Sequence, residues 1–419
     1  MMPGTGREKL LVTSEYPPNT TGGIQRTSVS FVDFAVNQAD FDVVWTYPCK
    51  KRKSATKDIE SGSHIKYEPM RSVANLPVLE KFPDQESSLR MANIINSGTG
   101  FTVIYSPDII GMTVFDKQTD LQKKKTTLIW NCPIDITLRD VDSSSMRDYI
   151  AYLISSPLYN TRNRMLRDRK MVDIPAVFNS YAIKKSFDDI FPKALPKEWV
   201  VIPPTGEFCH DCRLEKENID GDFTVLTVGR ITAKKGTGRI LNLATHMDTV
   251  LQDTGKNVRF FVVGDFQSSY GLWFAKEAEK INGTLSHCKV ELAGYVPDGD
   301  QLCQIYCNSD LFFQPSTIEG LSLVFSEAAS HGLPLLGFNI RGSGEAIAQF
   351  AEAGFLVESP TKSEYEKLAD KIKTIIGYPL ERRNMLSQLA KTTALREFSP
   401  PAVNLKMLDF ITRNGSTKK

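Results

Sequence analysis

Apolar segments of strand length alternate with amphipathic segments of helix length along most of the chain. The first example is the apolar segment 9–13, which is followed by a turn-rich stretch and then by apolar residues at helical spacing over 24–36. Short apolar strands separated by amphipathic helices are typical of parallel sheets that carry helices on both faces. The pattern therefore predicts an α/β fold.

This strand–helix pattern occurs twice, and a polar, turn-rich stretch over 203–222 separates the two occurrences. We expect two Rossmann-like domains, over residues 1–207 and 208–399. Ligands of such sheets bind beyond the carboxyl ends of the strands, so the turns that follow the strands are the places to search for chemistry. The predicted strands are 9–13, 41–46, 101–105, 127–130 and 176–179 in the first domain, and 223–228, 258–263, 290–293, 311–314 and 335–338 in the second.

Composition and charge exclude several classes of protein without identifying one. A hydrophobic fraction of 41% and a charged fraction of 24% exclude a disordered or fibrous chain. The net charge of +2 gives no reason to expect a nucleic-acid partner. No window contains the ~18 consecutive apolar residues of a membrane-spanning helix, and the first residues lack the apolar core of a secretory signal. The seven scattered cysteines fit reduced thiols, so we expect a cytoplasmic location.

Two adjacent glycines, Gly22 and Gly23, lie between the first predicted strand and the first predicted helix. Adjacent glycines let the backbone come close to a ligand, and the N-terminus of the following helix directs N–H groups toward an anion. The spacing is that of neither a G-x-G-x-x-G loop nor a Walker A loop. A tight turn without a ligand remains the alternative interpretation.

The first strand of the second domain leads into a basic turn that ends at Gly236. Arg230 and Lys235 lie within this turn. An arginine binds phosphate oxygens through its planar fork and a lysine does so as a point charge, so the pair suits a diphosphate. A solvated basic loop is the alternative interpretation.

The most specific pattern covers 314–334, where a hydrophobic strand is followed by Glu319 and, eight positions later, by Glu327. We expect a helix to begin near Gly320, so that the N–H groups of 320–323 face phosphate oxygens and the carboxylates accept hydrogen bonds from sugar hydroxyls. In the alternative interpretation Glu319 merely begins the helix and Glu327 lies on a solvated face. Three phosphate-suited turns at matching strand ends favour a ligand site.

Taken together, these turns resemble those of the retaining GT-B glycosyltransferases of glycosyltransferase family 4. The match spans nearly the whole chain and implies two Rossmann-like domains that face each other across a cleft. It also implies that a C-terminal helix within 400–419 crosses back to the first domain. The resemblance rests on Tyr16-Pro17-Pro18, Gly22-Gly23-Ile24, the Arg230 and Lys235 turn, Val263-Gly264-Asp265, Gly294-Tyr295-Val296, the paired glutamates, Gly342-Ser343-Gly344-Glu345 and Gly354-Phe355-Leu356-Val357.

The resemblance implies that a hexose-type sugar moves with retention of configuration from a nucleotide-diphosphate sugar, such as a UDP- or GDP-sugar, to an acceptor hydroxyl. It implies no metal and no cofactor. Arg230 and Lys235 would neutralise the diphosphate, Glu319 would hold hydroxyls of the transferred sugar, and these three are the implied catalytic residues. The implied donor-binding residues are Gly22, Gly23, Arg230, Lys235, Tyr295, Val296, Glu319, Gly320, Leu321, Ser322, Leu323 and Glu327.

One position departs from the family pattern. Many members carry a histidine after the first-domain strand that corresponds to 127–130, and this chain has Asn131 in that stretch. An amide still hydrogen-bonds a hydroxyl but does not titrate. Asn131 is therefore the candidate for a contact to the sugar or the acceptor, and histidine-assisted catalysis is not expected.

Other enzyme classes and other ligands are less well supported. A GT-B-fold epimerase needs acid and base groups around the sugar, a phosphorylase needs a cofactor lysine, and a catalytically inactive nucleotide-sugar-binding module would not need the charged residues above. The pair Cys209 and Cys212 lacks a second pair at zinc-ribbon distance, so no metal is predicted.

The identity of the acceptor is left open by the sequence, with a glycan, a glycolipid, a glycoprotein and a small molecule as the candidates. Basic runs at 50–53 and 162–170 lie in the acceptor-side domain. Solvated surface is the favoured interpretation of these runs, and attraction to an anionic acceptor or a peripheral membrane contact is the alternative.

Overall fold

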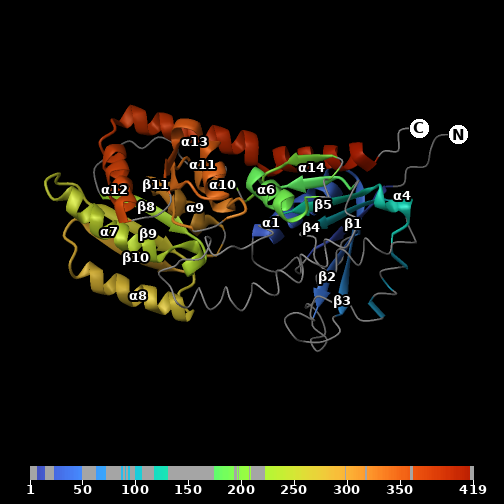
Figure 1. Ribbon diagram of the computed structural model, residues 1–419, viewed down its shortest axis with the longest axis horizontal. Coiled ribbons are helices and arrows are strands. Elements are labelled where there is room, and N and C mark those ends of the chain that lie inside the picture. The colour runs from blue at the N-terminus through green and yellow to red at the C-terminus, as the bar shows by residue number, and fades with distance from the viewer. Residues whose placement is uncertain are drawn as a thin grey trace. The chain divides into compact units, whose positions relative to one another are not determined.

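The chain forms two compact units, each built around its own parallel sheet (Figure 1). Of the residues that the structure describes, those up to Thr205 and those from Pro400 onward form the first unit, and those from Gly206 to Ser399 form the second. The computed structural model describes residues 7–14, 23–49, 63–71, 86–87, 90, 93–94, 100–105, 118–130, 174–192, 196, 198–206, 208, 222–297, 299–316, 319–358 and 362–415.

The sheet of the first unit has the strand order β3-β2-β1-β4-β5-β6-β7, with every described pair parallel. Successive strands are added on one side of β1 as far as β3 and on its other side from β4 onward. The position between β1 and β4 is therefore the topological switch point of a Rossmann-type sheet. The strands are β1 (Glu8–Thr13), β2 (Phe41–Cys49), β3 (Ile65–Arg71), β4 (Phe101–Tyr105), β5 (Thr126–Trp130), β6 (Ala176–Phe178) and β7 (Trp199–Val201).

Helices cover both faces of this sheet. On one face α1 (Gly23–Asn37) and α14 (Pro400–Gly415) pack on a core that contains buried residues of β1, β2 and β4. On the other face α6 (Tyr181–Ile190) packs on β5 and β6, and the Oγ of Ser180 begins this helix by accepting from the Ile183 N–H at 3.1 Å. The short α4 (Asp120–Lys123) precedes β5.

The last helix is part of the first unit. Val403, Met407 and Phe410 of α14 are buried in the same core as β1 and α1. The Asn404 side-chain amide donates to the backbone oxygen and the Oγ of Ser30 on α1, at 3.0 and 2.9 Å. The return of the C-terminal helix to the first unit, expected from the resemblance, is therefore confirmed.

The sheet of the second unit repeats the same order as β10-β9-β8-β11-β12-β13, again with parallel pairs. Its switch point lies between β8 and β11. The strands are β8 (Phe223–Val228), β9 (Val258–Val263), β10 (Cys288–Gly294), β11 (Leu311–Gln314), β12 (Leu335–Phe338) and β13 (Gly354–Val357).

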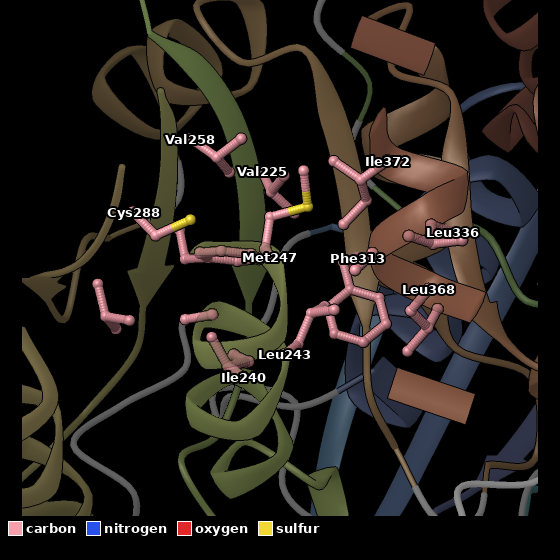
Figure 2. Close-up of a cluster of buried hydrophobic side chains, with 14 of the residues drawn as sticks. Val225, Ile240, Leu243, Met247, Val258, Cys288, Phe313, Leu336, Leu368 and Ile372 are labelled. Carbon is pink, nitrogen blue, oxygen red and sulfur yellow. The ribbon is translucent and has the colours of Figure 1, made fainter. Parts of the chain in front are cut away.

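Two separate apolar cores cover the faces of the second sheet. The first contains buried residues of α7 (Gly238–Leu251), α8 (Ser269–Asn282) and α12 (Lys362–Ile376). The second contains those of α9 (Asp300–Cys307), α10 (Leu323–Ser330), α11 (Ser343–Ala348) and α13 (Leu380–Phe398). In Figure 2 the first core brings side chains of α7 and α12 together around β8 and β11, with Ile240, Leu243, Met247, Leu368 and Ile372 surrounding Val225 and Phe313.

Cys288 lies at the border of the first of these cores and is a free, buried thiol. Its backbone N–H donates to Oδ1 of Asp248 at 2.9 Å, and the N–H groups of Ser286 and His287 donate to the same oxygen. Burial and, secondarily, the Asp248 charge raise the pKa of the thiol to about 12.

The strands that the sequence pattern did not predict, β3, β7 and β13, all lie at sheet edges. β3 mixes apolar with charged residues and contains Pro69, as an edge strand can, whereas β7 (WVV) and β13 (GFLV) are apolar but only 3 and 4 residues long. The expectation that the thiols are all reduced is wrong for Cys303 and Cys307, which are disulfide-bonded. None of the described helices is both long and apolar enough to cross a membrane.

Candidate active site

The turn after β8 carries the predicted basic residues at the carboxyl edge of the second sheet. Thr232 begins a single 3₁₀ turn, η3 (Ala233–Lys235), by accepting the Lys235 N–H on its Oγ1 at 3.3 Å. Gly236 ends the turn with a left-handed φ of +66°. A Cβ at this position would lie 1.9 Å from the backbone oxygen of Pro315, so only glycine lets the β8 turn lie against the end of β11.

The β8 and β11 turns meet in an ion pair between Lys235 and Glu319. Nζ lies 2.6 Å from Oε1, and the two side chains are 19% and 11% exposed. The Oγ of Ser316 donates to the same Oε1 at 2.6 Å. Among the described residues, no donor reaches the second carboxylate oxygen, Oε2. The predicted diphosphate-binding lysine and sugar-binding glutamate are thus in direct contact.

The backbone of Glu319 is held by the turn between β12 and α11. Its N–H donates to the backbone oxygen of Arg341 at 3.2 Å. Gly342, with φ of +80°, lies so close that a Cβ there would be 2.1 Å from the Glu319 backbone oxygen. Main-chain and side-chain contacts from three turns therefore position this one carboxylate.

The helix that follows Glu319 starts later than expected. We predicted a start near Gly320, whereas Ser322 is the extended residue before α10 and the helix begins at Leu323. Gly320 is half-buried, and the side chains of Leu321 and Leu323 are buried in the core. The candidate N–H donors at the helix N-terminus therefore begin with Leu323, and 320–322 form an irregular connection.

Glu327 is buried, with 3% of its surface exposed, so the alternative of a solvated face is wrong. Gly206 lies directly against it, because a Cβ on Gly206 would be 2.7 Å from Glu327 Oε1. At the end of the same helix, His331 Nδ1 donates to the Glu327 backbone oxygen at 2.7 Å. Burial lowers the pKa of His331, so a neutral imidazole stacks on Tyr306 with ring centroids 4.7 Å apart.

Two other predicted donor-binding side chains are exposed near this edge. Arg230, two residues past β8, is exposed and has no ion-pair partner within the described residues. Tyr295 follows the left-handed Gly294 at the end of β10 and is 64% exposed, while Val296 is buried. An exposed arginine and an exposed aromatic ring are thus available to a ligand, but neither contacts the Lys235–Glu319 pair.

The remaining predicted positions give less information. Gly23 is the first residue of α1, where its backbone oxygen accepts from Thr27 Oγ1 at 3.0 Å. Within the described ranges no three His, Cys, Asp or Glu side chains cluster as a metal site requires, and metal independence stays a prediction. Gly22, Asn131, the Cys209 and Cys212 pair and the basic runs at 50–53 and 162–170 lie outside the described residues.

Sequence reasoning missed several residues that shape the site. Ser316 lies inside the predicted β11 turn, three positions before Glu319, and its short side chain between a strand and a glutamate was the available signal. Arg239 donates to the Pro315 backbone oxygen at 2.8 Å and helps to join the β8 and β11 turns. No sequence signal marks the contact of Gly206 with Glu327, because more than a hundred residues separate them.

Residues 213–393 match the family model described as Glycosyl transferases group 1. The UDP-N-acetylglucosamine--peptide N-acetylglucosaminyltransferase GtfA subunit of Streptococcus parasanguinis is 33% identical over 79 residues, which are 19% of this chain and 15% of that protein. The capsular polysaccharide biosynthesis glycosyltransferase CapM of Staphylococcus aureus is 25% identical over 159 residues, 38% of each chain. This chain therefore aligns with less than half the length of either curated relative.

The similarity to solved structures extends over both units. Sucrose-phosphate synthase from Thermosynechococcus elongatus superposes with a TM-score of 0.66 at 16% identity, covering 97% of this chain and 99% of that one. At this identity the likeness concerns the fold. The chain thus has the GT-B fold of two Rossmann-like domains, and the part of it that builds the Lys235–Glu319 site matches the group 1 glycosyl transferases.

Proposed function

We propose that this protein is a glycosyltransferase that moves a sugar from a nucleotide-diphosphate sugar to an acceptor hydroxyl. The observation that carries the proposal is the Lys235–Glu319 pair at the switch point of the second sheet. A cation for a diphosphate and a carboxylate for hydroxyls lie side by side where Rossmann-like sheets bind ligands. The family match of 213–393 supports the same function.

In the proposed reaction the chain stabilises the charge that develops on the leaving diphosphate. Lys235 and Arg230 supply positive charge there, and a group that stabilises such developing charge lowers a barrier by ~3–4 kcal/mol. Lys235 is bound to Glu319 in the structure, so the diphosphate has to draw its Nζ away from that carboxylate. Glu319 then accepts hydrogen bonds from hydroxyls of the transferred sugar, and Glu327 from those of the ribose.

We propose retention of configuration without a metal, as in the family that the sequence resembles. The acceptor hydroxyl attacks carbon 1 of the sugar on the face that the diphosphate leaves. Its proton goes to the departing diphosphate oxygen as the new glycosidic bond forms and the old bond to phosphate oxygen breaks. This scheme needs no titrating histidine near Asn131.

The proposed donor carries a hexose-type sugar on UDP or GDP. A UDP-sugar is the first choice because one relative is named as a UDP-N-acetylglucosamine–peptide transferase. A glycan, a glycolipid, a glycoprotein or a small molecule remains the proposed acceptor, with the capsular polysaccharide enzyme as a precedent for a glycan. A cytoplasmic location with peripheral membrane contact belongs to the same proposal.

The test is nucleotide release from labelled UDP-glucose, UDP-N-acetylglucosamine and GDP-mannose, in the presence of a mixture of acceptor sugars. We expect release from one donor, and a loss of about 100-fold or more in Glu319→Gln. Glu358→Gln is the matched control, because Glu358 is an exposed carboxylate that accepts only from Asn339 within the described residues.

Other outcomes of this experiment would contradict the proposal in recognisable ways. A changed nucleotide sugar without nucleotide release would indicate an epimerase. Tight donor binding without turnover would indicate an inactive binding module. Release from no donor, together with no binding, would leave the enzymatic proposal without support.

A further inference from the structure

We infer that Ser316, supported by Gln314, is a positioning residue that holds Glu319 in place while Lys235 changes partners. The inference rests on the proposed function, because it assigns roles toward a nucleotide-diphosphate sugar. Neither residue belongs to the donor-binding set that the sequence implied. Both are in the segment that leads from the end of β11 to Glu319.

The side chains of Gln314 and Ser316 form a buried chain of two hydrogen bonds, here called the relay, that ends at the Glu319 carboxylate. Gln314 is the last residue of β11 and is 1% exposed, while Ser316 is 0% exposed. The Gln314 Nε2 donates to Ser316 Oγ at 2.9 Å, and Ser316 Oγ donates to Glu319 Oε1 at 2.6 Å. A hydrogen bond to an ionised group in such a buried place is among the stronger ones in proteins.

The chemistry of the three groups sets the direction of this relay. An ionised carboxylate only accepts, so the single proton of the Ser316 hydroxyl points toward Glu319. The serine oxygen must then accept from its other neighbour, which requires the NH₂ side of the Gln314 amide. Among the described residues no group donates to the buried amide oxygen of Gln314, and the hydrogen bond that its side chain makes to this part of the chain is the donation to Ser316.

The relay matters because the other group that donates a hydrogen bond to Glu319 Oε1 is Lys235, which in the proposed function also binds the diphosphate. Lys235 reaches Oε1 from the β8 turn, and Ser316 reaches it from the β11 turn. When Lys235 turns to a diphosphate, Ser316 remains as a donor from the site's own turn and keeps Oε1 occupied. Oε2, which receives no hydrogen bond from the described residues, is then presented to a sugar hydroxyl.

In this arrangement Glu319 binds the sugar and Lys235 binds the diphosphate, so different residues hold the two parts of the nucleotide sugar. Without the Ser316 hydroxyl, the carboxylate loses its remaining fixed partner as soon as Lys235 leaves. We therefore expect Ser316→Ala to weaken binding of a nucleotide sugar by about 10- to 100-fold, the range of one hydrogen bond to a charged group. Binding of the nucleoside diphosphate alone should change by less than about threefold, because Lys235 and Arg230 are retained.

The experiment is calorimetric titration with UDP-glucose, UDP-N-acetylglucosamine and GDP-mannose, each beside its own UDP or GDP. The sugar that the wild-type chain binds most tightly is then compared among variants. Ser309→Ala is the matched control, since Ser309 is equally buried but donates to the Ile305 backbone oxygen at 2.7 Å, away from Glu319. Gln314→Met should show the same selective loss as Ser316→Ala in a smaller form, about threefold to tenfold.

Equal losses for the sugar nucleotide and the bare nucleotide, or no loss for either, would overturn the positioning role. If wild-type protein binds none of the three sugars, the proposed function fails, and a crystal structure of Ser316→Ala decides the positioning role separately. A displaced Glu319 carboxylate supports it there. An unmoved carboxylate refutes it.

Discussion

The carboxyl edges of the two sheets share a topology and differ in chemistry. In the first unit, the described end of β1 and the neighbouring part of β2 carry neutral groups. Trp45 Nε1 donates to Ser14 Oγ at 2.8 Å, and Thr46 Oγ1 donates to Thr13 Oγ1 at 3.1 Å. In the second unit, the corresponding edge carries the Lys235–Glu319 ion pair.

This difference shows that strand order places a site and that the turns decide its chemistry. Both sheets reverse direction beside their central strand, so both present a switch point to a ligand. The charged groups that a diphosphate needs lie, among the described residues at the two switch points, on the second sheet. A variant of the Lys235–Glu319 pair should therefore alter donor binding, and a variant of the neutral Ser14–Trp45 pair should leave it unchanged.

The largest effect is expected when the cation is removed from the second sheet. Lys235→Ala should reduce nucleotide-diphosphate affinity and turnover by about 100- to 1000-fold, because it removes the charge that we propose faces the leaving group and leaves Glu319 without its ion-pair partner. Isothermal titration and nucleotide-release rates measure both quantities. Lys234→Ala, a change in the exposed neighbouring lysine, is the control. Similar losses in the two variants would mean that net charge, and not position, is what matters.

A smaller effect should follow from moving Glu319 without changing its charge. Gly342→Ala places a Cβ against the Glu319 backbone oxygen, and we expect turnover to fall by about 30-fold as the carboxylate shifts. Gly255→Ala is an unusually close control: Gly255 also has a left-handed φ, of +63°, but a Cβ there meets no atom within 4 Å. The backbone strain is thus shared, and only the contact differs. Equal activity of the two variants would show that Gly342 does not position Glu319.

The first unit provides the opposite test, in which stability changes and donor binding does not. Ser14→Ala leaves the buried Trp45 Nε1 without its hydrogen-bond acceptor, at a cost of about 2 kcal/mol in the free energy of unfolding. Urea denaturation followed by tryptophan fluorescence measures this cost. Affinity for a nucleoside diphosphate should stay within about twofold of wild type. A large loss of that affinity would place part of the donor site in the first unit.

The smallest expected effect is a pH dependence of stability that comes from the core of the second unit. In the unfolded chain the Cys288 thiol titrates near its ordinary pKa of 9.0, whereas in the folded protein the pKa is about 12. The contribution of the protonated Cys288 thiol to the free energy of unfolding is therefore complete below pH 9 and is lost as the pH rises from 9 toward 12. Between pH 8 and pH 10, the free energy of unfolding of wild type should fall by about 1 kcal/mol more than that of Cys288→Ala.

Chemical denaturation of both proteins at the two pH values measures this difference. Parallel curves would indicate that the thiol is accessible to solvent. Alkylation gives an independent check, because a buried, protonated Cys288 should react with iodoacetamide only after unfolding.

The sequence predicted the central strands and located the charged turns that follow them, because both depend on local patterns. Largely apolar runs such as that of β8 are typical of buried parallel strands. The pairing of Lys235 with Glu319 was not predicted, although both residues were assigned to the donor. Their contact depends on Gly236 lying against Pro315, and the spacing of residues along the sequence does not indicate a packing contact of this kind.

The error at the start of α10 has a similar origin. Gly320 follows a strand and precedes an apolar helical pattern, so local signals place the helix start there. The structure keeps Ser322 extended and begins the helix at Leu323, and the Glu319 N–H donates to the backbone oxygen of Arg341, which is distant in sequence. Contacts between turns that are distant in sequence thus decide the features that matter most for the site.

The position of α14 has a consequence for the order in which the protein can fold during synthesis. The core of the first unit includes Val403, Met407, Phe410 and Ile411, which leave the ribosome only after the whole second unit has been made. Domains usually fold in the order of their synthesis. Here the unit that starts first is completed last, so a nascent chain passes through a stage with a finished second unit and an exposed apolar face on α1. Chaperone binding during translation should therefore be strongest at that stage, and a stalled chain that ends at residue 399 and continues into a linker long enough to span the ribosome exit tunnel would capture it.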